Sequence, residues 1–185
     1  MNKRSQHSDF RKLAQEMILA GVKSADPRQA IQQSVQVRDN ILHVEGDTFA
    51  LGDYDRVLLF GIGKASTPMC HAFEEILVPD DGLAITKNGQ EIGLVQVNSI
   101  PVYEAYHPEP REENVVYSEQ ILAKIEAIKP DEKVLVVFMI SGGGSALFTD
   151  LPEGITISEL HRLNELLMKW GGPIHHINTI RKHVT

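Results

Sequence analysis

Two glycine-rich turns hold the residues of this 185-residue sequence whose types and spacing best suit anion binding. The first, residues 61–66, reads Gly-Ile-Gly-Lys-Ala-Ser, and the second, residues 141–145, reads Ser-Gly-Gly-Gly-Ser. Glycine lets backbone N–H groups turn toward an oxyanion, and a helix that starts at the end of the turn adds free N–H groups. Ser141 and Ser145 would add hydroxyl donors, and Lys64 would add a cation. The structural alternative is a tight turn in which backbone and helix only pack closely.

Neither turn satisfies the motif of a well-known nucleotide or hydrolase site. A Walker A loop needs glycine where Leu58 stands, and Ser or Thr where Ala65 stands. A dinucleotide-binding turn needs a third glycine, but Ser66 and Leu147 occupy those positions. The nucleophile elbow of serine hydrolases also needs glycine at position 147. These mismatches argue against P-loop hydrolysis, NAD binding and serine hydrolysis.

Two further segments carry polar side chains that could reach the same ligand. Residues 106–110, Tyr-His-Pro-Glu-Pro, form a turn between a weak strand and a helix. The segment 173–185 is predicted to be a short helix on which Asn178, Arg181 and Lys182 share one face. Such a face suits contact with an oxyanion, although a solvated basic face explains it equally well. The histidines of this segment lack the spacing and the acidic or cysteine partners of a metal site, so no metal ligand is predicted.

The elements that must position these turns begin at residue 55. A continuous apolar run at 56–61 predicts a strand buried on both faces. A shorter run at 82–86 predicts a second strand, and the run at 133–140 predicts the strongest strand of the sequence. A weaker strand is predicted within 95–104, because Pro101 interrupts it.

Three amphipathic stretches predict the helices that cover this sheet. One follows the first glycine turn, another spans 112–128, and the third runs from a capping box at Thr156 and Glu159 to Gly171. In the second helix, the residues expected to face the core are Val115, Leu122, Ile125 and Ile128. Alternating strands and helices indicate an α/β fold, a Rossmann-like three-layer α/β/α arrangement with a mostly parallel sheet. Ligands bind such sheets beyond the C-terminal ends of the strands, where all three turns are expected.

The N-terminal residues carry no chemical signature and are interpreted as an arm of helices and a β-hairpin packed on the core. Apolar residues three and four apart predict a helix over 8–21, and a second short helix opens at Pro27. Residues 37–51 have the pattern of a hairpin. We therefore divide the chain into an arm, residues 1–54, and an α/β core, residues 55–185, within one structural domain.

Composition narrows the class of protein further. Apolar residues make up 42% and charged residues 23% of the chain, as in ordinary globular proteins. The net charge of −7 and the lack of a basic stripe argue against a nucleic-acid partner. No apolar run approaches the ~20 residues that span a bilayer, and the first residues do not resemble a signal peptide. The single cysteine, Cys70, is expected to be a buried apolar residue in a reducing compartment, so we expect a cytoplasmic protein with no membrane partner.

Taken together, five stretches resemble the N-terminal part of the type II glycerate kinases, the glycerate 2-kinases. They occur in the order and at the approximate spacing of that family, and the resemblance covers nearly the whole chain. The stretches are Phe60 to Ala65 (FGIGKA), Gly82 to Gly89 (GLAITKNG), His107 to Pro110 (HPEP), Ile140 to Leu147 (ISGGGSAL) and Ile177 to Thr185 (INTIRKHVT). Each stretch alone is weak, whereas the ordered set is specific.

The resemblance implies an activity and a set of site residues. Members of the family transfer the γ-phosphate of ATP to D-glycerate with a divalent cation, usually Mg²⁺, in a cleft between two domains. Lys64 would be the catalytic residue, stabilising charge on the phosphoryl group or on the substrate carboxylate. The residues that would bind phosphate or substrate are Gly61, Gly63, Ser141, Gly142, Gly143, Gly144, Ser145, His107, Asn178 and Arg181.

The resemblance also implies that part of the active site lies elsewhere. The sequence shows no Mg²⁺-binding carboxylate beside a phosphate loop and no general base for the glycerate hydroxyl. The chain stops inside the last motif, so we expect it to be the N-terminal piece of the kinase and to be inactive alone. The expected product of the whole kinase is 2-phosphoglycerate. The alternatives are an incomplete module that binds phosphate or a hydroxy acid, and an oxidoreductase acting on hydroxypyruvate. A homodimer is one candidate assembly.

Overall fold

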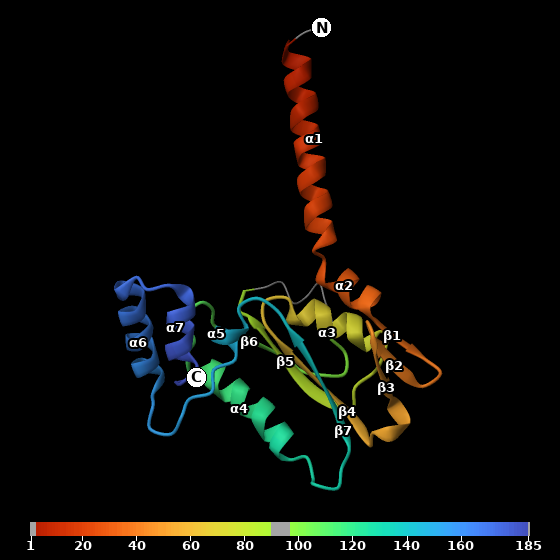
Figure 1. Cartoon of the computed structure of the whole chain (residues 1–185), viewed down its shortest axis with the longest axis vertical. Coiled ribbons are helices and arrows are strands. Elements are labelled where there is room, and N and C mark those ends of the chain that lie inside the picture. Colours follow the sequence, from red (N-terminus) through yellow and green to blue (C-terminus); the bar gives the residue numbers. More distant parts are fainter. Residues whose placement is uncertain (1–2, 90–96, 185) are drawn as a thin grey trace.

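The strands predicted after residue 55 pair as one parallel sheet in the order β6-β5-β4-β7 (Figure 1). The computed structural model describes residues 3–89 and 97–184. The strands are β4 (Arg56–Ile62), β5 (Asp81–Lys87), β6 (Val102–Ala105) and β7 (Val134–Ile140). Within the range 95–104, where a weak strand was expected, the observed strand β6 begins directly after Pro101. Residues 95 and 96 of that range lie outside the described residues.

Residues of β4 alternate between two apolar clusters, one on each face of the sheet. Leu59 packs in one cluster with Phe73 and Cys70, while Leu58 and Phe60 pack in the other. All five side chains are at most 1% exposed. Burial raises the pKa of the Cys70 thiol to about 12, with Glu74 contributing, which confirms the expected buried apolar role. The sheet therefore has helices on both faces, as predicted for an α/β fold.

Three helices follow the strands of the sheet and form its covering layers. Helix α3 (Ser66–Glu74) follows β4 and packs in the Leu59 cluster through Phe73. Helix α4 (Glu112–Glu126) follows β6, and the one-turn helix α5 (Gly144–Leu147) follows β7. Both pack in the opposite cluster, α4 through Ile121 and α5 through Leu147. The chain therefore leaves β4 and β7 toward opposite faces of the sheet.

The inward face of α4 differs from the face that apolar periodicity predicts. All four predicted residues are half-buried, but only Ile125 and Ile128 pack against a core cluster as expected, whereas Val115 and Leu122 belong to neither cluster. The fully buried positions are Asn114, Ser118 and Ile121. Two of these are polar, and a search for apolar spacing passes over them. They are buried because they form hydrogen bonds there.

Two helices complete the described chain beside α5. Helix α6 (Ile157–Trp170) begins with the predicted capping box, in which the hydroxyl of Thr156 accepts from the Glu159 N–H and the Glu159 carboxylate accepts from the Thr156 N–H. It ends at Gly171 in the left-handed conformation, with φ of 68°. Helix α7 (Ile174–Arg181) follows, as the sequence predicts. No described helix is long and apolar enough to cross a membrane.

The N-terminal region contains a three-stranded antiparallel sheet rather than a single hairpin. Helix α2 (Pro27–Ser34) starts at Asp26, whose carboxylate accepts from the Arg28 N–H. Strands β1 (Val35–Arg38), β2 (Ile41–Val44) and β3 (Asp47–Ala50) follow, and a short 3-10 turn, Leu51–Asp53, leads to β4. Strand β1 was not predicted. Its signal is the Asp39-Asn40 pair, whose φ angles of 51° and 59° are those of a tight hairpin turn.

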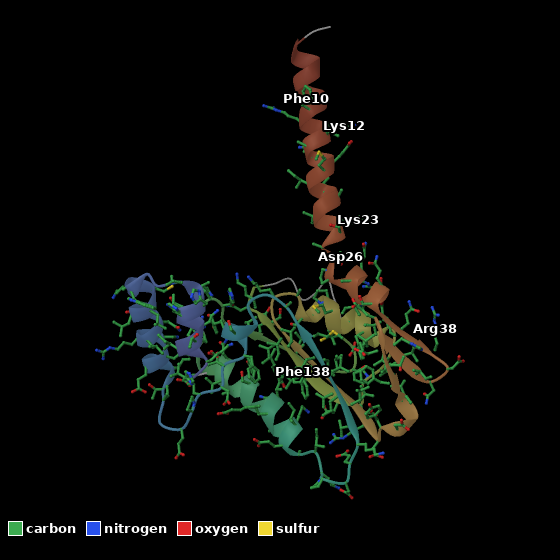
Figure 2. All side chains as sticks on the ribbon, viewed as in Figure 1. Phe10, Lys12, Lys23, Asp26, Arg38 and Phe138 are labelled. Carbon is green, nitrogen blue, oxygen red and sulfur yellow. The ribbon has the colours of Figure 1, made fainter. Side chains whose placement is uncertain are left out.

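Helix α1 (Lys3–Ser24) contradicts the expectation that the whole arm packs on the core. It extends away from the rest of the molecule (Figure 1), and Phe10 near its outer end has no covering element (Figure 2). Phe10, Leu13, Met17 and Ile18 are between 52% and 69% exposed. Residues of α2, β1 and β2 already join the Leu59 cluster, through Ile31, Val35 and Leu42. The apolar stripe of α1 shows that a helix forms but does not specify which surface covers it.

The ion pair between Lys124 and Asp81 lies at the end of the sheet opposite the glycine turns, and it should make the stability of the protein depend on pH. The Lys124 ammonium donates to both carboxylate oxygens of Asp81, at 2.8 and 2.6 Å, and the Gly82 N–H also donates to Asp81. Burial raises the pKa of Asp81, but the hydrogen bonds from Lys124 and Gly82 outweigh it and lower that pKa overall. A lowered folded-state pKa stabilises the protein above the unfolded-state pKa, and this stability is lost as the pH falls.

We expect Asp81→Asn to lower the free energy of unfolding at pH 7 by about 0.5–1 kcal/mol, because both partners are partly solvated. The difference from the unmodified chain should shrink toward zero as the pH falls through the folded-state pKa of Asp81. Urea denaturation at constant ionic strength between pH 7 and pH 3 measures it. A difference that stayed constant over this range would show that the carboxylate charge contributes nothing.

Candidate functional site

The strand order places the two glycine turns at a topological switch point. Counted from β4, the parallel strands lie in the order 3-2-1-4, so the chain reverses direction across the sheet between β4 and β7. The helices after these two strands lie on opposite faces of the sheet, and it is at such a point, beyond the C-terminal ends of the strands, that open α/β sheets bind ligands. Residues 63–66 and 141–145 lie at this edge.

The two turns are locked together by backbone hydrogen bonds. The Lys64 N–H donates to the Gly142 carbonyl at 3.0 Å, and the Ser141 N–H donates to the Ile62 carbonyl at 2.9 Å. The Ala65 N–H donates to the Ser141 hydroxyl at 2.9 Å. Gly63 has φ of 127°, and a Cβ there would lie 2.6 Å from the Ser141 carbonyl oxygen. The structure therefore assigns Gly63 and Ser141 to the joint between the turns.

Gly61 is closely packed inside the sheet, and its predicted contact with a ligand stays a prediction. It lies inside β4 and is buried, and a Cβ there would be 2.6 Å from the Cys70 sulfur and 2.9 Å from Ala84. Its missing side chain lets α3 and β5 approach β4. Close packing therefore accounts for a glycine at position 61, in agreement with the structural alternative for such a turn.

Lys64, His107 and Gly143 meet at this edge of the sheet. A Cβ on Gly143, whose φ is 90°, would lie 3.0 Å from His107 Nε2 and 3.1 Å from Lys64 Cε, so both side chains rest against this glycine. Lys64 is exposed and His107 is half-buried. Burial lowers the pKa of His107, and the charges of Lys64 and Lys87 lower it further. These effects favour the neutral imidazole, which can accept a proton or a hydrogen bond.

The second glycine turn offers backbone donors beside these side chains. Among the described residues, the N–H groups of Gly142, Gly143 and Ser145 donate to no acceptor, whereas Gly144 N–H donates to the Ser141 carbonyl. An anion at this turn would meet N–H groups and the Lys64 ammonium together, which is the donor set that oxyanions require. Gly144 is thus part of the turn's internal hydrogen bonding.

Three further predicted site residues, from α5 and α7, line one pocket. Ser145, Asn178 and Arg181 line a pocket of about 620 Å³, which also includes Lys182. The predicted shared face of α7 therefore exists. The sequence-predicted site consists of two neighbouring groups, with Gly143 in one and Ser145 in the other.

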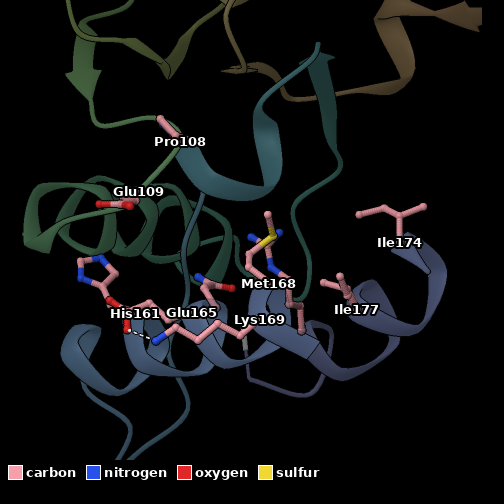
Figure 3. Close-up of a pocket in the computed structure, with 10 residues that line it drawn as sticks. Pro108, Glu109, His161, Glu165, Met168, Lys169, Ile174 and Ile177 are labelled. Atoms are coloured by element: carbon pink, nitrogen blue, oxygen red, sulfur yellow. Dashed lines mark ion pairs between the residues drawn. The ribbon is translucent and has the colours of Figure 1, made fainter. Parts of the chain in front are cut away.

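Helix α6 contributes residues that the sequence analysis did not single out. A second pocket of about 560 Å³ lies between the 106–110 turn, α6 and α7 (Figure 3), and Arg181 lines both pockets. His161 of α6 lies within hydrogen-bonding distance of the Pro110 carbonyl, at 2.5 Å, and ties this helix to the turn. Figure 3 shows Met168 of α6 and Ile177 of α7 among the residues that line this pocket. No local sequence signal joins these segments, since the contacts are made only in the folded chain.

The described residues do not form a dedicated metal site. No group of three or more His, Cys, Asp or Glu side chains comes together within residues 3–89 and 97–184. Mg²⁺ in phosphoryl-transfer sites is usually held by one or two carboxylates together with substrate phosphates and waters, so it does not require such a group.

Comparisons with known proteins agree with this fold and show the family. The family model described as a domain of unknown function, DUF4147, matches residues 13–185. The glycerate 2-kinase of Pyrococcus horikoshii is 36% identical over 96% of this chain and 39% of that protein. A putative hydroxypyruvate reductase of Agrobacterium vitis is 32% identical over 90% of this chain and 34% of that protein.

A solved structure extends the comparison to the fold. The crystal structure of a glycerate kinase from Thermotoga maritima superimposes with a TM-score of 0.75 and 30% identity, covering 96% of this chain and 39% of that one. The chain thus spans about two fifths of the length of the glycerate kinases it matches. The match over residues 13–185 shows that the chain belongs to the DUF4147 family, in which it is a relative of the glycerate 2-kinases.

Proposed function

We propose that this chain forms the substrate- and phosphate-binding part of an ATP-dependent D-glycerate 2-kinase. The observation that carries the proposal is the meeting of Lys64, His107 and Gly143 at the switch point of the sheet. The names of relatives support the reaction class, because three relatives that are 31% to 36% identical to this chain are named glycerate 2-kinases.

The proposed reaction uses the donors at this edge of the sheet for charge stabilisation. The terminal phosphoryl group moves from ATP to the 2-hydroxyl oxygen of D-glycerate as its bond to the ADP oxygen breaks, the hydroxyl proton is released to solvent, and ADP and 2-phosphoglycerate leave. The transition state spreads negative charge over the phosphoryl oxygens, so positioned cations and N–H groups lower its energy. Lys64 and the N–H groups of Gly142 and Gly143 are assigned this role. Mg²⁺ is proposed only as the counter-ion of ATP.

The pocket beside α7 suits the substrate carboxylate. Arg181 presents a planar fork of donors that matches a carboxylate, and Asn178 and Ser145 add neutral hydrogen-bonding groups in the same pocket. A small hydroxy acid held there would lie next to the second glycine turn. We assign Ser145, Asn178 and Arg181 to D-glycerate binding on this ground.

The 185-residue chain alone is proposed to bind ligand without turning it over. It spans 39% of the length of the P. horikoshii relative, and its described residues bring together no group of three metal-ligating His, Cys, Asp or Glu side chains. The proposal therefore separates a binding function in this chain from turnover by the longer protein. Cytoplasmic location and a homodimer stay predictions, the second of which light scattering tests.

An enolase-coupled assay tests the reaction and its product. The complete gene product and the 185-residue chain are assayed in parallel with D-glycerate, ATP and Mg²⁺, with enolase, pyruvate kinase and lactate dehydrogenase. Signal without added phosphoglycerate mutase identifies 2-phosphoglycerate, and signal only with the mutase identifies the 3-isomer. No ATP-dependent signal from the complete gene product would overturn the proposal. NADH consumption with hydroxypyruvate and no ATP would favour the reductase instead.

A further inference from the structure

Asn114, in the first turn of α4, uses every hydrogen-bonding position of its amide in the interior of the protein. The side chain is fully buried. Its oxygen accepts from the N–H groups of Tyr106 and Arg111, both at 3.0 Å. Its nitrogen donates to the carbonyl groups of Tyr106 and Ala146, both at 2.8 Å. Two acceptances and two donations are the full capacity of an amide.

These four bonds join the two backbones that hold the candidate site. Tyr106 directly precedes His107, and Arg111 lies at the far end of the same turn, so Asn114 fixes both ends of it. Ala146 lies on α5, directly after the glycine turn, and its helix is bonded back to Gly143. One side chain therefore ties the segment that carries His107 to the segment that carries Gly143.

This tie is needed because the strands do not bring the two segments together. His107 follows β6 at one edge of the sheet, and Gly143 follows β7 at the other, with β5 and β4 between them. Strands in a sheet are about 4.8 Å apart, so the two strand ends are roughly 14 Å apart. His107 nevertheless rests against Gly143. Asn114 is the described residue whose side chain bonds both backbones.

We propose that Asn114 is a positioning residue that holds His107 against Gly143 and Lys64. Its consequence for turnover rests on the proposed function, but its consequence for the geometry of His107 does not. Asn114 touches no ligand in this proposal and acts through His107 alone. Without its donation to Ala146, the 106–110 turn separates from α5 and His107 gains solvent.

The titration of His107 reports this geometry directly. Lys64 from the turn after β4 and Lys87 from the end of β5 are the charged groups that lower its pKa, together with burial. A turn that moves away from α5 weakens the effects of burial and of Lys64. The pKa of His107 should then rise toward its ordinary value, whereas a loss of stability elsewhere in the protein would not move it.

The test compares Asn114→Ala with Ser118→Ala in the ligand-free full chain. Ser118 lies one helical turn further along α4, is equally buried, and accepts from the Thr149 N–H at 2.8 Å without a bond to the 106–110 turn. Both variants leave buried backbone groups unpaired, so both should lower the thermal midpoint. We expect an NMR titration to show a raised His107 pKa in Asn114→Ala and an unchanged one in Ser118→Ala.

The kinetic arm uses the complete gene product. Asn114→Ala should lower kcat for D-glycerate roughly tenfold, with KM for ATP little changed, and Ser118→Ala should leave kcat near that of the unmodified enzyme. If Asn114→Ala fails to fold, the milder Asn114→Ser is titrated in its place. An identical His107 pKa in the Asn114 and Ser118 variants would overturn the inference, whether or not the enzyme is a kinase. A shifted pKa in a protein without kinase activity would support the inference and overturn only the proposed function.

Discussion

Replacing Lys64 by alanine is expected to lower kcat/KM for ATP-dependent phosphorylation of D-glycerate by about 10²–10³-fold, the usual effect of removing one transition-state donor. Lys64 is exposed, and within residues 3–89 and 97–184 it forms no ion pair. Its loss therefore leaves no buried group unpaired, and the free energy of unfolding should change by less than about 0.5 kcal/mol. The enolase-coupled assay and urea denaturation measure the two quantities.

Lys133→Ala is the matched control for this variant. Lys133 is also an exposed lysine, but it directly precedes β7 and so lies at the opposite end of that strand from the glycine turn. Its removal changes the net charge by the same amount and should leave kcat/KM unchanged. Equal effects of Lys64→Ala and Lys133→Ala would point to overall charge, and undiminished turnover by Lys64→Ala would remove it from the site.

The positions of the turns could be predicted because they depend on local pattern. An unbroken apolar run such as 56–61 identifies a strand buried on both faces, and a turn that follows such a strand must lie at its C-terminal end. Parallel pairing then brings the ends of β4 and β7 to one edge. The sheet order itself was not predictable, since nothing local in the sequence states that β4 lies between β5 and β7.

The contact between His107 and Gly143 could not be predicted for a second reason. It depends on Asn114, a polar residue on a helix face that was sought by apolar spacing alone. A sequence search would read Asn114 and Ser118 as solvent-facing, because buried Asn and Ser are uncommon. Only their partners, the Tyr106 and Ala146 backbones and the Thr149 N–H, explain their burial. Those partners are set by tertiary structure.

Gly143→Ala is also expected to lower kcat/KM strongly. This substitution changes the geometry of the site, whereas Lys64→Ala removes a charge from it. The φ of 90° at Gly143 is costly for any residue with a Cβ, by about 1–3 kcal/mol. The new methyl group would also lie 2.9 Å from His107 Cδ2 and 3.1 Å from Lys64 Cε. Both contacts are with side chains that can move, so the protein should still fold, but His107 and Lys64 should move away from Gly143. We expect kcat/KM to fall by about 10²-fold, the scale of a displacement near 1 Å.

The neighbouring glycine makes the argument testable within a single turn. A Cβ on Gly142 would meet nothing within 4 Å, and its backbone is not in the left-handed region. Gly142→Ala should therefore change both turnover and the free energy of unfolding only slightly. If the two variants lost activity equally, the requirement would lie in the flexibility of the whole turn and the contact of Gly143 with His107 and Lys64 would be incidental. A loss confined to Gly143→Ala would instead mean that those two side chains must rest on this backbone for the site to work, which is the same geometry that Asn114 is proposed to maintain from the other side.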